Sequence, residues 1–151
     1  MLIGVIFNYI EIVLLTLLFF NILRFFAFGL HAKKSWQCLV MSILEFNVLT
    51  FIFTKIDINT YFSFIIFIFS LISFILFSPS DTEKRPLTNN SKRLIRKIIS
   101  ILLLIVLFII SNQINFFKIP ILCSFIIESI LINPLTYKLL GLKYNNYKNK
   151  A

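Results

Sequence analysis

INTYFSFIIFIFSLISFILF, residues 58–77, gives the clearest indication of how this chain folds. It contains no charged residue, and it is as long as the roughly 20 apolar residues that a helix needs to cross a bilayer. Small Ser and bulky Phe residues are mixed along it, which suits the packing of one membrane helix against another. The stretch therefore predicts a transmembrane helix.

Further apolar runs of similar length accompany it along the chain. Together they give five candidate spans: Leu2–Leu23, Trp36–Thr54, Ile58–Phe77, Ile95–Ile114 and Phe116–Tyr137. Hydrophobic residues make up 59% of the sequence and the mean hydropathy is +0.94, which is more than a soluble domain of 151 residues needs. We therefore expect an all-α, polytopic helical membrane protein with about five transmembrane spans, forming a single domain over residues 1–151.

The basic residues alternate in density between the runs. Thirteen of the 15 Lys and Arg residues lie in the stretches 24–34, 84–97 and 138–150, and the remaining two are Lys55 and Lys118. By the positive-inside rule the three dense stretches belong on the cytoplasmic side of the membrane. The formal net charge of +9 is then mainly a signal of topology, and it requires no nucleic-acid partner.

A polar loop is expected over residues 78–94, SPSDTEKRPLTNNSKRL, because Pro79 and Pro86 punctuate a stretch rich in turn-forming residues. Leu94 and Ile95 follow among four cations and suit the headgroup boundary of a bilayer. Two interpretations of this loop stay open. It is either a solvated orientation signal or a docking surface for an acidic partner segment.

Few residues in this chain can do proton or acyl-transfer chemistry. The only histidine, His31, lies seven residues before Cys38 in the basic stretch RFFAFGLHAKKSWQC, residues 24–38. A thiolate is the nucleophile in cysteine chemistry and a neighbouring imidazole can take its proton, so this pair is the minimal set for cleaving an amide through a thioester. The alternative is a surface imidazole and a small apolar thiol. One histidine and two cysteines suggest neither a zinc site nor a disulfide framework, and we expect no metal and no cofactor.

The spacing of His31 and Cys38 sets a condition on the backbone. On a continuous helix, residues seven apart share a face but are separated by a rise of roughly 10.5 Å, whereas proton transfer needs heavy atoms about 3 Å apart. The chain must therefore bend between them, and Gly29 supplies permissive backbone just before the histidine. We expect His31 in a loop over residues 24–35 and Cys38 in the first turns of the second span, where a helix N-terminus favours the thiolate.

The residues around this pair resemble those of the accessory gene regulator B family of bacterial membrane peptidases. That family has an arginine, a glycine, a histidine and a cysteine at the spacings seen here for Arg24, Gly29, His31 and Cys38. The stretch SPSDTEKRP, residues 78–86, is similar to a proline-bounded, acidic-then-basic loop of the family. The resemblance covers residues 20–100 in motif and the last two spans by hydropathy only.

The chain departs from the family pattern at two points. Phe28 stands where the family usually has the first of two glycines, which puts the backbone path of the loop in doubt. Family members are also longer by an N-terminal span, and we expect this chain to lack that segment.

The resemblance implies a cysteine endopeptidase that matures a quorum-sensing pheromone precursor in the bacterial cell membrane, with its catalytic loop and C-terminus in the cytoplasm. Cys38 would attack a precursor carbonyl with His31 as general base, and a precursor thiol would then displace Cys38 to give a thiolactone. Arg24 and Gly29 would position the loop or the precursor. The acidic tail of the precursor would bind four cations: Lys84, Arg85, Lys92 and Arg93. The implied partners are the precursor peptide, the lipid bilayer and a second copy of the chain in a homodimer.

Two other functions stay open. Glu11, Glu45 and Glu128 fall within apolar runs, where a charge is expensive. A small peptide or ion transporter, or a fragment of a permease, would use such buried acids, although hydrogen bonding between helices is their simpler role. The other alternative is an inactive paralogue that binds the precursor without cleaving it. Cys123, inside the last run, is expected to serve packing.

Overall fold

The computed structural model describes residues 9–30, 35–81 and 87–144, and within these ranges all the regular elements are α-helices. In chain order they are α2 (Ile10–Ala27), α3 (Ser35–Lys55), α4 (Thr60–Phe77), α5 (Asn90–Gln113), α6 (Asn115–Leu131) and α7 (Pro134–Leu139). The expected all-α fold is confirmed.

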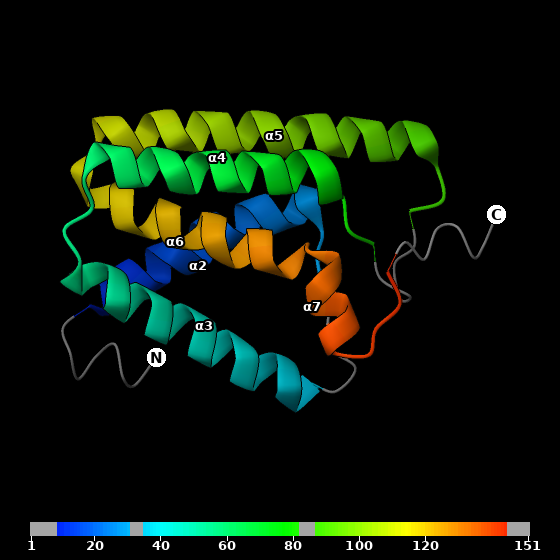
Figure 1. Cartoon of the computed structure of the whole chain (residues 1–151), viewed down its shortest axis with the longest axis horizontal. Coiled ribbons are helices and arrows are strands. Elements are labelled where there is room, and N and C mark those ends of the chain that lie inside the picture. Colours follow the sequence, from blue (N-terminus) through cyan, green and yellow to red (C-terminus); the bar gives the residue numbers. More distant parts are fainter. Residues whose placement is uncertain (1–8, 31–34, 82–86, 145–151) are drawn as a thin grey trace.

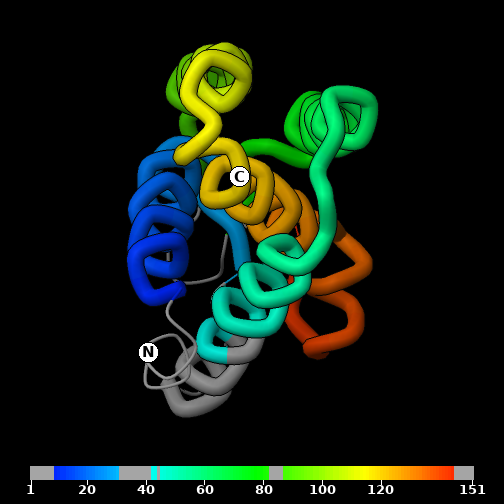
Figure 2. Tube along the Cα trace, turned by 90° about the vertical axis from the view of Figure 1, so that its left-hand side faces the viewer, coloured from blue at the N-terminus to red at the C-terminus, as the bar shows by residue number. Residues whose placement is uncertain are grey.

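Helix α6 lies at the centre of the bundle. Figure 1 shows α4 and α5 side by side, and Figure 2 shows α6 between this pair and α3, with α2 along its flank. Helix α6 packs against all four of these helices. Its residues Ile121, Leu122 and Phe125 are completely buried, as is Cys123. The fifth apolar run, which contains α6, therefore supplies the core of the protein.

Three of the helices, α2, α4 and α5, are long and apolar enough to cross a membrane. Helices α3 and α6 coincide with the second and fifth apolar runs. Helix α6 has only 17 residues, which corresponds to about 25 Å of helix. The protein is thus a helical membrane protein, and the count of five spans stays a prediction.

The apolar runs predict the ends of the helices less well than their existence. Arg24, expected in a loop, lies in the last turn of α2, and Lys92 and Arg93 lie in α5, which begins at Asn90. The prediction that these three residues lie in loops was wrong, because the hydrogen bonds of a helix continue into polar residues beyond its apolar run. The side chain of Asn89 caps α5 by accepting hydrogen bonds from two backbone N–H groups of its first turn.

The fifth run is not one span to Tyr137. Helix α6 ends at Leu131, and Asn133 then caps the separate short helix α7 by accepting a hydrogen bond from the N–H of Leu135. Pro134, at the first position of α7, suits a new helix start because its missing N–H would have had no helical partner there. The end of the fifth run therefore forms a separate short helix, α7, which changes direction after the end of α6 (Figure 1).

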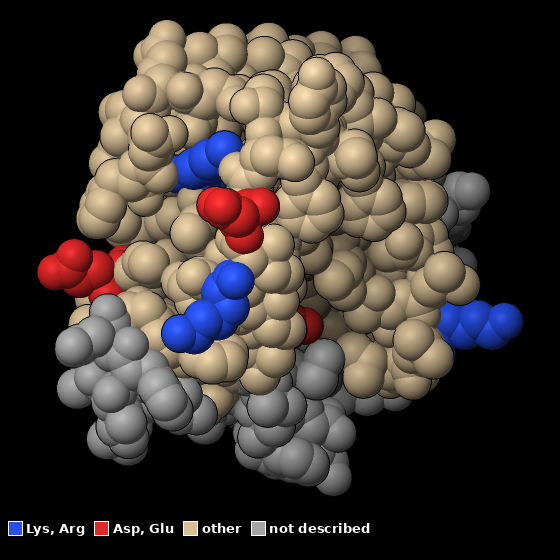
Figure 3. All heavy atoms as spheres, turned by 60° about the vertical axis from the view of Figure 1, so that its left-hand side comes forward, with Lys and Arg blue, Asp and Glu red and all other residues tan. Residues whose placement is uncertain are grey.

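Much of the outer surface is apolar. Large side chains such as Leu18, Phe64 and Leu102 are more than half exposed, at 52%, 53% and 55%. Figure 3 shows one face of the molecule on which a few Lys, Arg, Asp and Glu side chains lie within a broad surface of other residues. An uncovered apolar surface of this extent is typical of a protein whose solvent is the bilayer.

Candidate active site

The structure describes some of the residues predicted for the site. Helix α3 begins at Ser35, so the backbone of Cys38 lies in its first turn. The side chain of Cys38 and the whole of His31, Lys84 and Arg85 lie outside the described residues. The pairing of imidazole and thiol is therefore still a prediction. Described in full are four of the predicted residues: Arg24, Gly29, Lys92 and Arg93.

The backbone that leads from α2 towards His31 is held by the segment that follows α4. The N–H of Gly29 donates to the carbonyl of Ser80 at 3.0 Å, and the N–H of Ser80 donates to the carbonyl of Ala27 at 3.0 Å. These two bonds form a parallel β-bridge between Phe28 and Ser80. Residues more than 50 positions apart in the sequence are thereby joined through main-chain groups, which every residue carries whatever its side chain.

The same segment is also tied to the end of α6. The N–H of Leu30 donates to the carbonyl of Leu131 at 3.1 Å. The guanidinium of Arg24 donates to the carbonyl of Leu30, so it holds the residue immediately before His31. This contact supports a loop-positioning role for Arg24.

Both residues after α2 have positive φ. Phe28 has a φ of 64° and Gly29 has a φ of 122°. The first value is in the left-handed region that non-glycine residues rarely adopt, and the second is open essentially to glycine alone. The side chain of Phe28 is held by a cation–π contact: the guanidinium of Arg96 lies over its ring, 4.6 Å from the centroid. The departure from the glycine pair thus leaves a strained backbone that neighbouring contacts hold in place.

Glu128 lies directly behind this turn. A Cβ placed on Gly29 would be 3.3 Å from Oε1 of Glu128. The Glu128 side chain is completely buried in the middle of the bundle, and neither carboxyl oxygen has a hydrogen-bond partner among the described residues. Burying a carboxyl without hydrogen-bond partners is costly, so Glu128 is a candidate for a functional role beside Gly29.

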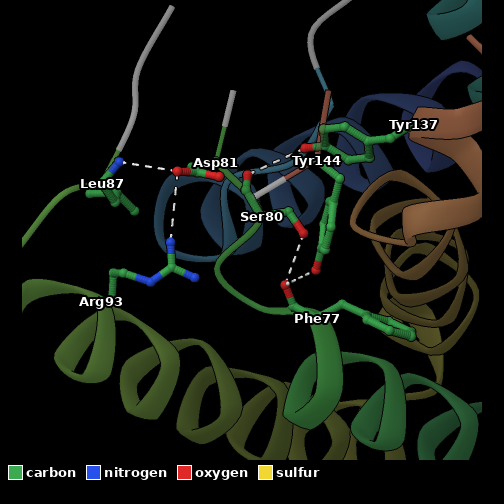
Figure 4. A network of polar contacts seen from close by, with 7 residues as sticks. All are labelled: Phe77, Ser80, Asp81, Leu87, Arg93, Tyr137 and Tyr144. Atoms are coloured by element: carbon green, nitrogen blue, oxygen red, sulfur yellow. Dashed lines mark hydrogen bonds and ion pairs between the residues drawn. The ribbon is translucent and has the colours of Figure 1, made fainter. Parts of the chain in front are cut away.

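Ser80 is the centre of a second group of contacts. Its hydroxyl lies 2.8 Å from the carbonyl of Phe77 and 2.7 Å from that of Ile132, so it joins α4 to the end of α6. Tyr137 of α7 donates to the carbonyl of Ser80 at 3.4 Å, and Tyr144 donates to that of Phe77 at 3.4 Å (Figure 4). Burial, followed by the proximity of Tyr144 and Asp81, raises the pKa of Tyr137, which keeps its hydroxyl a donor.

Asp81 continues this network towards α5. Its carboxylate lies 3.7 Å from the guanidinium of Arg93 and accepts a hydrogen bond from the N–H of Leu87 at 3.4 Å (Figure 4). Only 1% of the Asp81 side chain is exposed. Arg93, predicted to bind substrate or position the loop, therefore pairs with the carboxylate that also accepts a hydrogen bond from Leu87.

Sequence reasoning missed Ser80, Asp81, Tyr137 and Arg96 as members of this site. The polar cluster around Ser80 is visible in the sequence, but an isolated Ser-Pro-Ser-Asp stretch is also an ordinary loop. Arg96 donates to the carbonyl of Phe25 at 3.0 Å, a contact across 71 positions that no local pattern indicates. Within the described residues, no three His, Cys, Asp or Glu side chains are grouped as they would be around a metal ion.

Together these contacts define a helical membrane protein in which backbone and polar contacts fix the segment Phe28–Leu30, which follows α2 and precedes the cysteine-bearing helix α3 in the sequence. The sequence profile of the Accessory gene regulator B family matches residues 1–136. The chain belongs to this family.

Named relatives agree with this assignment. An AgrB-like protein of Listeria monocytogenes serotype 4a is 36% identical over 128 residues, which cover 83% of this chain and 63% of the relative. An AgrB-like protein of Clostridium acetobutylicum is 35% identical over 145 residues, covering 93% of this chain and 68% of the relative. The accessory gene regulator protein B of Staphylococcus aureus is 31% identical over 125 residues, covering 82% and 66%. The chain thus spans about two thirds of the length of these relatives. No solved structure matches it.

Proposed function

We propose that this protein acts in accessory gene regulator quorum sensing as a membrane cysteine endopeptidase that processes the precursor of a peptide pheromone. In this proposal Cys38 is the nucleophile and His31 is the general base. The family assignment supports the pathway and the class of substrate. The residues of this chain supply the argument for the mechanism.

The proposed reaction has two acyl transfers. The Cys38 sulfur gives its proton to His31 and attacks a backbone carbonyl of the precursor, forming a C–S bond. The amide C–N bond then breaks, and His31 returns the proton to the leaving amine of the C-terminal tail. A thiol within the bound precursor next attacks the thioester, which forms a thiolactone and restores the Cys38 thiol. No water is consumed in this sequence, so a site at the edge of the membrane suits it.

The single observation that carries the proposal is the way the backbone before His31 is held. Ser80, Leu131 and Arg24 together bind both sides of the Gly29–Leu30 segment. A general base must stay within hydrogen-bond reach of its nucleophile, and a fixed approach to the loop reduces the entropy lost in reaching that geometry. Catalytic and binding residues are often carried by loops that a rigid scaffold positions in this way.

The remaining predicted residues take supporting roles. We propose that Lys84, Arg85 and Lys92 attract the acidic tail of the precursor, whereas Arg24, Gly29 and Arg93 position the loops around the site. The proposed orientation puts this end of the bundle and the C-terminus in the cytoplasm, following the positive-inside rule. Homodimerisation is part of the proposal, and single-molecule photobleaching in native membranes would test it.

The experiment co-expresses this chain with its cognate precursor and follows the mass of the precursor. Cys38→Ala and His31→Ala should both abolish cleavage, whereas Cys123→Ala, which removes the other thiol, should not. A precursor whose internal cysteine is replaced by serine should leave an acyl-enzyme, seen as a mass adduct on the Cys38 peptide. Processing that persists in Cys38→Ala or in His31→Ala would remove that residue from the mechanism.

One observation favours a second candidate, the transporter. Glu128 is a completely buried carboxyl without a hydrogen-bond partner among the described residues, as a group that binds and releases a proton would be. A transporter predicts that Glu128→Gln abolishes uptake of its solute while Cys38→Ala does not. An inactive paralogue predicts that the precursor co-purifies with the protein at its original mass.

A further inference from the structure

A pocket of about 480 Å³ opens at the end of the bundle where α4 finishes and α5 begins. Its walls come from the last turn of α4, the first two turns of α5, and the stretch around α7. The residues that hold the segment before His31 (Ala27, Ser80, Leu131 and Arg24) do not line it, although its lining residue Arg93 is paired with Asp81, the neighbour of Ser80. Its lining residues include Leu76, Arg93, Leu94, Lys97 and Tyr144.

The pocket combines positive charge with apolar walls. Among the residues that the structure describes, its charged lining residues are Arg93 and Lys97, and no described acidic side chain lines it. Arg93 is partly neutralised by Asp81 at 3.7 Å, whereas Lys97 has no ion-pair partner among the residues that the structure describes. Arg93 lies in the first turn of α5, where the helix dipole is also positive, and Lys97 follows one turn later on the same helix. The electrostatics of the pocket therefore favour an anion.

The apolar part of the pocket is continuous with the outer surface of the bundle. Leu76 of α4 is 63% exposed and Leu94 of α5 is 59% exposed. Both helices are long and apolar enough to span a membrane, and the pocket lies at the end of each. It thus lies where hydrocarbon meets headgroups, with Leu76 and Leu94 on the hydrocarbon side.

We propose that this pocket binds an anionic phospholipid, with the headgroup phosphate at Lys97 and Arg93 and an acyl chain along Leu76 and Leu94. A basic pocket between membrane helices is the arrangement that recognises lipid phosphates. A soluble phosphate would use the cations but would leave the two exposed leucines without an occupant. An acidic peptide would have to bury its backbone against them. The lipid is the occupant that satisfies both walls.

The test measures lipid retention on the full chain by native mass spectrometry. The protein is titrated in detergent with phosphatidylglycerol and, separately, with phosphatidylcholine of the same acyl chains. We expect the wild type to retain phosphatidylglycerol about fivefold more tightly than Lys97→Gln does, the effect of one cation near an anionic lipid. Lys97→Arg should keep the preference, which shows that the fold tolerates substitution at this position.

Lys92→Gln is the matched control. Lys92 carries the same charge on the same helix but is exposed and does not line the pocket, so its removal should leave lipid retention unchanged. Equal losses in Lys92→Gln and Lys97→Gln would mean a diffuse surface attraction and would overturn the proposal. So would equal retention of the two lipids by the wild type.

Two competition arms separate the other occupants. Glycerol 3-phosphate carries the phosphate without the acyl chains, and we expect it to compete poorly. If it displaces the lipid as well as phosphatidylglycerol itself does, the pocket is a soluble-anion site and the proposal fails. Displacement by a hexaglutamate peptide but not by glycerol 3-phosphate would assign the pocket to an acidic peptide and would also overturn it.

Discussion

The Cβ position of Gly29 lies 3.3 Å from Oε1 of Glu128, so the turn before His31 and the carboxyl at the centre of the bundle occupy adjacent space. Gly29 also has a φ of 122°, which excludes other residues on its own. The backbone conformation and the contact with Glu128 therefore each favour glycine at position 29. A glycine at this point lets the loop approach the buried end of α6 closely enough for Leu30 to bond Leu131.

Gly29→Ala should destabilise the protein and impair the site. Backbone strain of about 1–3 kcal/mol adds to the contact with Glu128. Gly141→Ala is the matched control, because Gly141 also has a positive φ, of 61°, but a Cβ there meets nothing within 4 Å. Thermal unfolding in detergent should show a larger loss for Gly29→Ala. An equal loss in the two variants would mean that the contact with Glu128 contributes nothing.

Shortening Glu128 should partly rescue Gly29→Ala. In the double variant Gly29→Ala/Glu128→Ala the carboxyl no longer meets the new methyl group, although the backbone strain remains. We expect a coupling free energy of about 0.5–3 kcal/mol between the two positions in a double-mutant cycle. The same cycle with Glu45→Ala, in place of Glu128→Ala, is the control, since Glu45 is not among the contacts of Gly29. Strict additivity at Glu128 would contradict the packing described here.

Arg24→Gln should slow precursor cleavage more than it lowers stability. The guanidinium bonds the carbonyl of Leu30, and a hydrogen bond from a charged donor contributes about 1.5–3 kcal/mol at most, less here because Arg24 is only half-buried. The readout is the initial rate of precursor processing, compared with the unfolding midpoint. Asn21→Ala, one turn earlier on the exposed side of α2, should change neither. An unaltered rate in Arg24→Gln would end its positioning role.

The ion pair between Asp81 and Arg93 should stabilise the segment after α4. Asp81 is buried, so Arg93→Gln removes a cation that lies beside a buried carboxylate and should cost about 1–3 kcal/mol of unfolding free energy. Arg93→Gln in an Asp81→Asn background should cost much less. Lys92→Gln, the neighbouring exposed cation, should cost less than about 0.5 kcal/mol. If Arg93→Gln and Lys92→Gln behave alike, the pair does not hold this segment.

Cys123 should resist alkylation in the folded protein. Its side chain is completely buried in α6, so a thiol reagent reaches it only after unfolding. In Cys38→Ala, maleimide labelling in native membranes should therefore be negligible until denaturant is added. In Cys123→Ala we expect labelling of Cys38 without denaturant, because the proposed nucleophile must be accessible to a peptide. Rapid native labelling of Cys38→Ala would contradict the burial of Cys123.

Hydropathy predicted the existence of the helices well, because each apolar run is long enough to indicate a helix without information from the rest of the chain. The positions of α3, α4 and the middle of α5 follow the runs closely. The ends did not follow, since Asn89 and Asn133 set two helix starts through local hydrogen bonds rather than through hydrophobicity. The family pattern also pointed to Arg24 and Gly29, and the structure supplies a physical reason for each residue.

The all-α class and the membrane as solvent follow from the sequence alone, because composition and run length carry that information locally, and the choice of His31 and Cys38 for acyl chemistry is still a prediction. Only the tertiary structure placed α6 at the centre and joined Gly29 to Ser80, Leu30 to Leu131 and Arg96 to Phe25. These are contacts of main-chain groups and long side chains across the bundle. A backbone carbonyl is the same in every residue, so no pattern of side chains could have indicated which ones would meet.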